Sequence, residues 1–417
     1  MFSEYKGIPS QARLLVYLSF IPGIAIGFIY SDLSYFLPNV QNLPPVQAGY
    51  VGSVMGLSLV GLSIPFGILA DRYGRRKMLI IGNVCASLSL MGFALTTGFY
   101  LYLLIAFLEG TGEAAYAVSV SALIADKAGD TKRTAAFSLQ AFLGWIAGAI
   151  GGFILSTLYA LQGIGLGTRE AHIVLYVVVG LLNLSITPLI FRVQESAAIE
   201  DRGEILPRKS GRVLAKFLSY SVLIAFGAGL FVPIMGFWFS RAYGVSDEIS
   251  GPVLGVTYLV TAFAVFMSPR LATKLGLVKA TVLTQGFSMV FMVVIPSSPG
   301  FAAASTLYLV RVFLMNLSNP LTQSLIMGLV SPDERGMASG ITASLWRLPN
   351  AFSQIVGYVL IDSGQLGLPF YLATLLYACG ISIFWFEFKD AKLPEESLGP
   401  SQLPAQSSSL EGPELER

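Results

Sequence analysis

A short basic turn decides the fold of this chain: Asp71-Arg72-Tyr73-Gly74-Arg75-Arg76-Lys77. The turn carries four basic residues and lies between two long apolar runs, at about residues 48–70 and 78–97. A polar turn this short can join two membrane-spanning helices only at one face of a bilayer, because irregular backbone is excluded from the hydrocarbon core. The turn therefore predicts a hairpin of two membrane helices.

The composition places the whole chain in a membrane. Of its 417 residues, 54% are hydrophobic and only 12% are charged, whereas a soluble domain has about 25% charged residues. The mean hydropathy is +0.70. The net charge of +2 gives no sign of nucleic-acid binding, and a single histidine, His172, excludes a histidine-rich metal or catalytic cluster. Two cysteines, Cys85 and Cys379, fall inside apolar runs and indicate small core residues.

Twelve apolar windows approach or exceed the length of about 20 residues that a helix needs to cross the hydrocarbon core. Most of them lack the recurring polar face of a soluble amphipathic helix. We therefore predict an all-α membrane protein with twelve transmembrane helices. The windows are 14–38, 48–70, 78–97, 100–124, 134–160, 171–191, 213–240, 251–270, 279–296, 301–329, 337–361 and 367–388.

The basic residues predict the orientation. With the N-terminus in the cytoplasm, 22 of the 26 lysines and arginines fall on the cytoplasmic side, and only Arg169 and Arg241 fall on the other side. The remaining two, Arg311 and Arg347, lie inside apolar windows. We expect a multi-pass protein of the plasma membrane with both termini in the cytoplasm.

A polar stretch at 192–216 divides the chain into two halves. We predict a six-helix bundle at 1–191, a cytoplasmic loop at 192–212, a second bundle at 213–388 and a disordered cytoplasmic tail at 389–417, which is rich in Pro, Ser and Glu. A faint repeat with an offset of 202 residues relates the halves. Gly74 matches Gly276, and Arg133 matches Arg335.

The residues before the basic turn extend it to a recognisable motif, GILADRYGRRK, which begins at Gly67. This segment resembles the loop between helices two and three of the major facilitator superfamily, G-x-L-A-D-R-x-G-R-[RK]. The resemblance covers roughly residues 14–388. It implies two pseudo-symmetric six-helix bundles with a substrate site between them near the membrane midplane.

The same resemblance implies a gate at the basic turn. Asp71 and Arg75 would latch neighbouring helix ends in the outward-open state, with Arg72 beside them, while Gly67 and Gly74 would allow close packing. The alternative is that the arginines only fix the topology and bind anionic lipid head groups. That alternative leaves Asp71 unexplained.

Five ionisable residues stand out inside the apolar windows, where a charge at the bilayer centre costs roughly 2.5–3.5 kcal/mol: Asp32, Glu109, Glu113, Arg311 and Arg347. Glu109 and Glu113 are four residues apart and share one helix face. Two carboxylates that close are not expected to be ionised together in a low dielectric, which favours a proton carrier. Arg311 follows Glu109 by 202 residues, so the two could face each other across a cavity. Fixed ion pairs that pin the helices together are the alternative.

The fourth window resembles a narrower group, the spinster lysolipid transporters, in two segments: Leu108-Glu-Gly-Thr-Gly-Glu-Ala-Ala-Tyr116 and Ala122-Leu-Ile-Ala-Asp126. On this resemblance Glu113 and Asp32 take the places of the helix-4 glutamate and the helix-1 aspartate of that group. The arginines expected near these acids are Ala106 and Leu33 here.

The second half resembles prokaryotic efflux-type members of the superfamily instead. The segments that carry this resemblance are Arg311-x4-Asn316-x2-Asn319-Pro320 and Asp333-Glu-Arg-Gly-x-Ala-Ser-Gly340. In the fifth window, the glycines from Gly144 to Gly152 approach the antiporter motif G-x3-G-P-x2-G-G but lack its proline, and close helix packing accounts for them.

Aromatic and amide side chains complete the candidate substrate site. Tyr30, Tyr35, Trp238 and Asn316 are candidates, as are the phenylalanines at 231, 237 and 239, although such residues more often face lipid. His172 begins the sixth window and indicates an interfacial position more than a proton relay.

These observations predict a secondary transporter that moves a small organic or amphipathic solute by alternating access, with proton-coupled efflux as the first interpretation. The runner-up is a symporter or facilitator for an organic anion bound by Arg311 and Arg347. The sequence contains no Walker motif GxxxxGK[ST], no grouped nucleophile and base, and no channel-type repeat, which argues against a pump, an enzyme or a channel. We expect a monomer that interacts with its solute, protons and membrane lipids, and that uses no cofactor, metal or nucleic acid.

Overall fold

The computed structural model describes residues 7–195, 210–331 and 334–391. Within these ranges the regular elements are all helical, as the sequence predicts. The predicted linker and tail fall mostly outside the described residues, at 196–209 and 392–417, and so does Asp333 of the predicted efflux-type segment.

The first bundle contains six membrane-spanning segments. The first span combines α1, α2 and the π-helical turn η1, and α5 holds two spans separated at Gly129, where φ is +65°. The elements are α1 (Ser10–Leu18), α2 (Phe20–Tyr35), η1 (Phe36–Val40), α3 (Pro45–Tyr73), α4 (Arg75–Leu95), α5 (Phe99–Ile154), η2 (Leu155–Thr157), α6 (Leu158–Gly163), α7 (Thr168–Ser185) and α8 (Thr187–Ile190).

The second bundle repeats this plan. Its seventh span of the chain is broken between α9 and α10, and η3 extends the ninth span. The elements are α9 (Gly211–Gly229), α10 (Met235–Tyr243), α11 (Asp247–Leu275), α12 (Leu277–Val294), η3 (Ile295–Ser297), α13 (Phe301–Leu329), α14 (Arg335–Asp362) and α15 (Leu368–Phe388).

Eleven described segments are long and apolar enough to cross a membrane. Each corresponds to one of the predicted windows. The remaining window, 337–361, is the 28-residue helix α14, which carries the polar side chains of Arg347, Asn350 and Gln354. These residues lower its hydropathy because they face the interior of the protein rather than lipid, as described below.

The helix boundaries confirm the internal repeat. Helix α3 covers Pro45–Tyr73 and α11 covers Asp247–Leu275, so both ends differ by the 202 residues that separate Gly74 from Gly276. Both glycines end their helix with a positive φ, +105° and +76°, a region in which glycine avoids the steric cost of a side chain. The starts of α4 and α12, and of α5 and α13, differ by the same offset.

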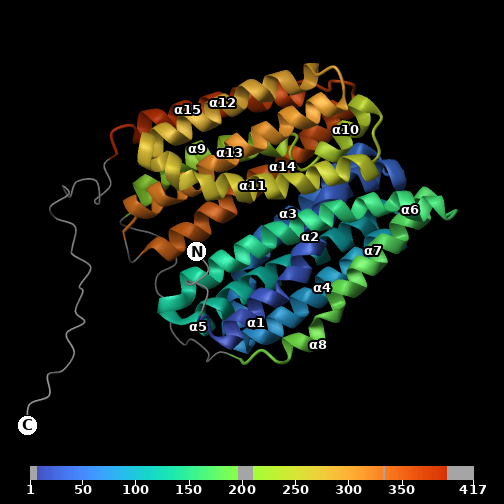
Figure 1. Ribbon diagram of the computed structural model, residues 1–417, viewed down its shortest axis with the longest axis horizontal. Coiled ribbons are helices and arrows are strands. Elements are labelled where there is room, and N and C mark those ends of the chain that lie inside the picture. The colour runs from blue at the N-terminus through green and yellow to red at the C-terminus, as the bar shows by residue number, and fades with distance from the viewer. Residues whose placement is uncertain (1–6, 196–209, 332–333, 392–417) are drawn as a thin grey trace, which may run out of the picture.

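The two bundles lie side by side, and Figure 1 shows them approaching each other at the end that carries α6 and α10. We call this the distal end, and the end that carries the turn at Gly74 the basic end. Hydrogen bonds cross between the bundles in the distal half. Among them, Ser53 Oγ donates to Ala351 O at 2.5 Å, and Tyr358 OH donates to Ser34 O at 3.3 Å.

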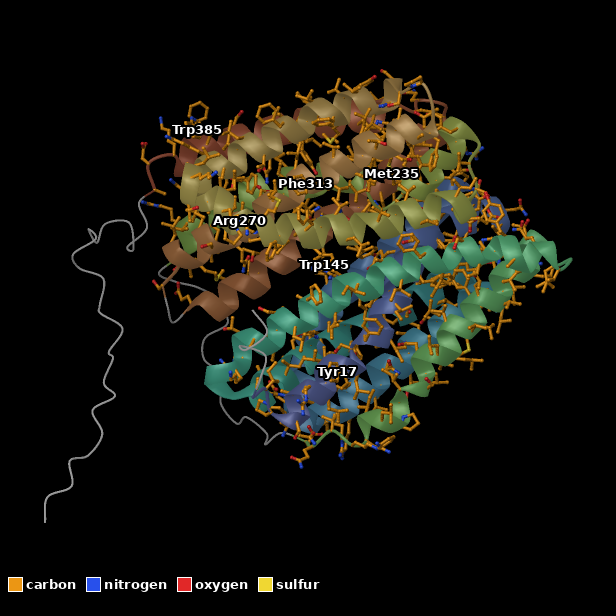
Figure 2. The ribbon with its side chains drawn as sticks, viewed as in Figure 1. Tyr17, Trp145, Met235, Arg270, Phe313 and Trp385 are labelled. Atoms are coloured by element: carbon orange, nitrogen blue, oxygen red, sulfur yellow. The ribbon has the colours of Figure 1, made fainter. Side chains whose placement is uncertain are left out.

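Glycines on α5 allow the closest contact between the bundles. A Cβ atom at Gly152 would lie only 2.5 Å from the Cα of Gly255 on α11, and one at Gly148 would lie 2.6 Å from the ring of Tyr258. Trp145, which Figure 2 shows between the bundles, lies with its ring 6.2 Å from that of Tyr258. The predicted packing role of the α5 glycines is therefore confirmed.

Candidate functional site

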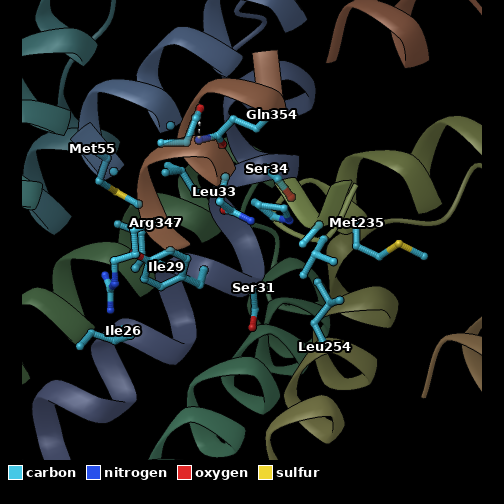
Figure 3. Close-up of a pocket in the computed structure, with 18 of the residues that line it drawn as sticks. Ile26, Ile29, Ser31, Leu33, Ser34, Met55, Met235, Leu254, Arg347 and Gln354 are labelled. Carbon is cyan, nitrogen blue, oxygen red and sulfur yellow. Dashed lines mark hydrogen bonds between the residues drawn. The ribbon is translucent and has the colours of Figure 1, made fainter. Parts of the chain in front are cut away.

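A cavity of about 540 Å³ lies between the two bundles. Its wall is mostly apolar, with a few polar groups from each bundle, which is the usual make-up of a small-molecule site. Figure 3 shows part of this wall, with Arg347 of α14 near Ile26 and Ile29 of α2, and Gln354 of α14 near Ser34. The wall includes Ile26, Tyr30, Ser34, Met55, Leu59, Glu113, Leu254, Tyr258, Tyr308, Arg347, Asn350 and Gln354.

Glu113 and Arg347 connect the two bundles across this cavity. Arg347 Nη1 on α14 donates to Glu113 Oε1 on α5 at 3.2 Å, and Tyr30 OH on α2 donates to Oε2 of the same carboxylate at 3.0 Å. The Glu113 side chain is 11% exposed, and that of Arg347 is 49% exposed. Glu113 lies at the middle of the span Phe99–Gly129, so this charged contact is at the depth of the membrane midplane.

Glu109 lies one helical turn from Glu113 and is buried between α2, α4, α5 and α7. Both carboxylates border a second cavity of about 20 Å³, which also contacts Asn83 and Asn183. This volume suits about one water molecule. Glu109 Oε2 has no hydrogen-bond partner among the described residues. The predicted stacking of the two carboxylates on one helix face is thus present in the structure.

Arg311 does not face Glu109, which corrects the expectation drawn from the repeat. Its guanidinium is buried inside the second bundle, where Nη2 donates to Tyr377 OH at 2.7 Å and the group lies 4.9 Å from the ring centre of Phe231. No carboxylate of the described residues lies within 4 Å of it. The offset of 202 residues predicts depth in the membrane, but it does not predict which way a side chain points around the helix axis.

The predicted lining residues are divided by the structure. Tyr30 lines the cavity, whereas Trp238 is buried in the second bundle and donates its indole N–H to Leu366 O at 2.9 Å, an acceptor that a buried indole requires. Asn316 donates to Val312 O at 2.8 Å on its own helix. Four further aromatic residues pack in the apolar core instead of the cavity wall: Tyr35, Phe231, Phe237 and Phe239.

The basic turn forms a network within the first bundle. Arg75 is buried and donates through Nε to Asp71 Oδ1 at 3.0 Å, and its Nη1 contacts Asp126 near the end of the first span of α5. The backbone N–H of Arg76 points to the Glu195 carboxylate at 3.2 Å. Asp71 and Arg75 therefore pair with each other, and Arg75 also contacts the end of a neighbouring span.

The other residues predicted for the gate lie beside the pair of Asp71 and Arg75. Arg72 is exposed, with its guanidinium 5.5 Å from the ring centre of Tyr73. Gly67 is buried on α3, and Gly74 turns the chain beside Glu195.

The structure places Asp32 at the distal end, outside the cavity wall, together with residues that sequence reasoning missed. Asp32 Oδ1 lies 4.0 Å from His172 Nε2, and the same nitrogen is 2.6 Å from Asp247 Oδ2 on α11. Beside them, Gln162 Nε2 of α6 donates to Glu248 Oε1 of α11 at 2.6 Å. All of these contacts except that of Asp32 with His172 connect the two bundles.

The family model described as Major Facilitator Superfamily matches residues 15–353 and 217–411. This chain belongs to the major facilitator superfamily. It is a transporter of that superfamily rather than an enzyme, and its mostly apolar helices make it an integral multi-pass membrane protein.

Relatives of this superfamily member include bacterial drug-resistance proteins. It is 23% identical over 410 residues to Multidrug resistance protein 2 of Bacillus subtilis, covering 92% of this chain and 98% of the relative. It is 24% identical over 380 residues to Multidrug resistance protein 1 of the same organism, covering 87% and 92%. Protein spinster homolog 1 of Xenopus laevis is 31% identical over 183 residues, which is 43% of this chain and 33% of that protein.

Solved structures share the fold at low identity. A bacterial homolog of the human lysosomal transporter Spinster, in an inward-facing and unoccupied conformation, has a TM-score of 0.74 and 14% identity, covering 90% of this chain and 96% of that chain. The nucleoside transporter NupG has a TM-score of 0.75 and 13% identity, covering 91% and 99%. These likenesses support the superfamily architecture described above.

Proposed function

We propose that this transporter exports a small organic or amphipathic solute in exchange for protons, and that Glu113 is the group that binds and releases the proton. The observation that carries the proposal is the contact of Glu113 with Arg347. It joins the two bundles at mid-depth, in the wall of the cavity that both bundles form. A proton on Glu113 therefore acts where the bundles must separate.

The charge of Glu113 determines the strength of this contact. An ionised carboxylate accepts both the bond from Arg347 and the bond from Tyr30, and charge-assisted hydrogen bonds are roughly twice as strong as neutral ones. A protonated carboxyl loses the attraction to Arg347. Proton binding then changes the relative stability of conformations that do and do not make the contact, and alternating access requires such a change.

Glu109 provides a second proton position next to Glu113. The cavity of about 20 Å³ between the two residues has room for one water, which could pass a proton from one carboxyl to the other. We propose that Glu109 receives the proton from Glu113 during the transport cycle. The amides of Asn83 and Asn183 near this cavity would hold the water in place.

We place the basic end in the cytoplasm, because 22 of the 26 lysines and arginines fall on that side. The protein is then closed at its outer side by the contacts of the distal end. In this orientation the network of Asp71, Arg75 and Asp126 holds the cytoplasmic ends of α3, α4 and α5 in one rigid group, against which the second bundle moves.

The cavity wall supports an amphipathic solute. Apolar side chains such as Met55, Leu59 and Leu254 form most of it, and Asn350 and Gln354 add neutral hydrogen-bonding groups. The Glu113 and Arg347 charges neutralise each other, so a neutral or weakly charged organic solute needs no further counter-charge. The relatives named for multidrug resistance agree with this class of solute.

The test uses purified protein in proteoliposomes with a lipophilic fluorescent cation as the probe. Wild type should transport the dye when a pH gradient is imposed. Glu113→Gln should abolish gradient-driven transport and leave dye exchange measurable, whereas Glu113→Asp should retain part of it. Gradient-driven transport that Glu113→Gln leaves unchanged would remove Glu113 from the proton pathway.

One observation favours a second function, transport of an organic anion. The Arg347 side chain is half exposed to the cavity, so a carboxylate or sulfonate on the solute could replace Glu113 as its partner. Arg347→Gln should then abolish binding of an aromatic sulfonate dye, while binding of the lipophilic cation stays within about twofold, a difference worth less than about 0.5 kcal/mol. Arg311, which the sequence suggested for this role, is already bonded inside its bundle.

A further inference from the structure

The distal end contains a buried cluster of three titratable groups that come from both bundles: Asp32 on α2, His172 on α7 and Asp247 on α11. Their side chains are 0%, 0% and 1% exposed. His172 and Asp247 are 75 residues apart in the chain and belong to different bundles, yet Nε2 and Oδ2 approach to 2.6 Å. Figure 1 shows the ends of α7 and α11 at the same end of the molecule.

The hydrogen bonds of His172 determine how many protons the pair holds. Nδ1 lies 2.6 Å from the backbone oxygen of Thr168, which can only accept, so Nδ1 carries a hydrogen. Nε2 and the Asp247 oxygen are two further atoms that each carry a lone pair. A separation of 2.6 Å between them requires one hydrogen on the line that joins them. The contact of His172 with Asp247 therefore exists only while the pair holds this proton.

Asp32 makes a second proton necessary. Neither of its carboxylate oxygens makes a hydrogen bond of good geometry among the described residues, although Tyr176 and Asp247 lie beside it, and Oδ1 of Asp247 makes none either. An ionised carboxylate without a partner in such a site costs several kcal/mol, so the neutral form is favoured. With one proton on Asp32 and one shared by His172 and Asp247, the three groups together are neutral.

No cationic group of the described residues other than His172 lies within 4 Å of these acids. The titratable groups that face the cluster are Tyr35 from α2, Tyr176 from α7 and Glu248 from α11. Tyr102 of α5 is close enough to Tyr176 to interact with it electrostatically, and Arg169 is close enough to Tyr102 to do the same. Among the described residues, His172 is thus the positive or neutral partner on which both aspartates depend.

We propose that His172, Asp247 and Asp32 form a proton-operated latch that holds the distal ends of the two bundles together. Protonation closes the distal side. When the shared proton leaves, the nitrogen and oxygen lone pairs repel and a negative charge remains on the buried carboxylate of Asp247, so the distal side opens. With the basic end in the cytoplasm, the latch takes its protons from the external side, so external acid closes the outer gate after the solute has left.

This inference rests on the proposed proton coupling for its biological meaning, but it concerns different residues and has a different readout. The test is a distance measurement in full-length protein in nanodiscs. Spin labels are attached at Ile164→Cys in the first bundle and Gln365→Cys in the second, both exposed at the distal end, after Cys85 and Cys379 are changed to serine.

Wild type should show a short distance at about pH 5 and a growing long-distance population as the pH rises to about 9, the range in which imidazole groups titrate. Loss of one proton changes the ratio of closed to open molecules by up to about tenfold for each pH unit. Asp247→Asn can donate its amide N–H to Nε2, so it should keep the distal end closed at alkaline pH and remove the response.

Ser53→Ala is the matched control, because it removes another bond between the bundles without removing a titratable group. It should keep the pH response. Wild-type distances that do not change between about pH 5 and about pH 9 would overturn the latch. A distal end that closes only when Zn²⁺ is added would also overturn it, because a metal ion and not a proton would then be bound by these three side chains.

The two proposals can fail separately. If the distal distance responds to pH but Glu113→Gln leaves gradient-driven dye transport unchanged, the latch stands and the proposed role of Glu113 is removed. The reverse result would remove only the latch.

Discussion

Arg347 on α14 donates a hydrogen bond to Glu113 on α5 across the interface of the two bundles, with 3.2 Å between Nη1 and Oε1. The two residues are 234 positions apart in the chain and come together at mid-depth in the membrane. Because each residue belongs to a different bundle, any motion that separates the bundles at this depth must break this hydrogen bond.

The contact should be measurable as an interaction free energy. We expect Glu113→Gln and Arg347→Gln each to lower the free energy of unfolding in mixed micelles, and the double variant to lose less than the sum by about 1 kcal/mol. The half-exposed arginine keeps this value small. Glu109→Gln with Arg347→Gln is the control, and it should be additive within about 0.5 kcal/mol. Additive losses in the first pair would contradict the contact.

Arg311 should act through Tyr377 and not through Glu109. Tyr377→Phe removes the acceptor of Arg311 Nη2 and should lower the free energy of unfolding by about 1–2 kcal/mol, because a buried donor is left unpaired. In dye transport, Glu109→Ala should fail to restore an inactive Arg311→Ala variant. Restored transport in the double variant would show that the two residues pair in some state of the cycle.

The glycine contact between α5 and α11 should tolerate no side chain. Gly152→Leu inserts atoms where the Cα of Gly255 already lies, so we expect a loss of about 1–3 kcal/mol in stability and a loss of dye transport. Gly144→Leu is the matched control on the same helix, because a Cβ there meets nothing within 4 Å. Thermal unfolding and transport of the two variants, measured side by side, test this difference. Equal behaviour would refute a packing role for Gly152.

The basic turn should depend on the conformation of Gly74. Gly74→Ala places a side chain at a φ of +105° and brings its Cβ 2.7 Å from the Glu195 carboxylate, so we expect destabilisation of about 1–3 kcal/mol. Gly286→Ala within α12, where a Cβ has free space, should be neutral or stabilising by up to about 1 kcal/mol. A denaturation series on both variants checks the prediction, and a stable Gly74→Ala protein would contradict it.

The sequence predicts the architecture well because membrane folding is governed by local patterns. Apolar windows of sufficient length and the offset of 202 residues between Gly74 and Gly276 predict the helices and their repeat, since each span satisfies its own backbone hydrogen bonds. The contact of Arg75 with Asp71 is of the same local kind, because the residues are four positions apart, although the family resemblance assigned both residues only to a latch.

Contacts between the bundles could not be predicted in the same way. Asp247 and Glu248 stand at the start of α11, where acidic residues are common because they complement the helix dipole, so nothing in the sequence distinguishes them from surface residues. His172 was expected at the interface with water, and it is buried against Asp247 instead. The direction of a side chain around its helix, which separates Arg311 from Arg347, depends on tertiary packing.

The bare contact between Gly152 and Gly255 has a mechanical consequence. Where two helix backbones touch without interdigitating side chains, no side chain has to change its rotamer when one helix tilts against the other. The energy cost of tilting at this contact is therefore low. The hydrogen bonds that must be broken and remade lie elsewhere, and those of His172 and Glu113 are the ones that depend on a proton. The bundles can therefore tilt at the glycine contact at little cost, and the free-energy barrier to the conformational change is set mainly by the contacts of His172 and Glu113.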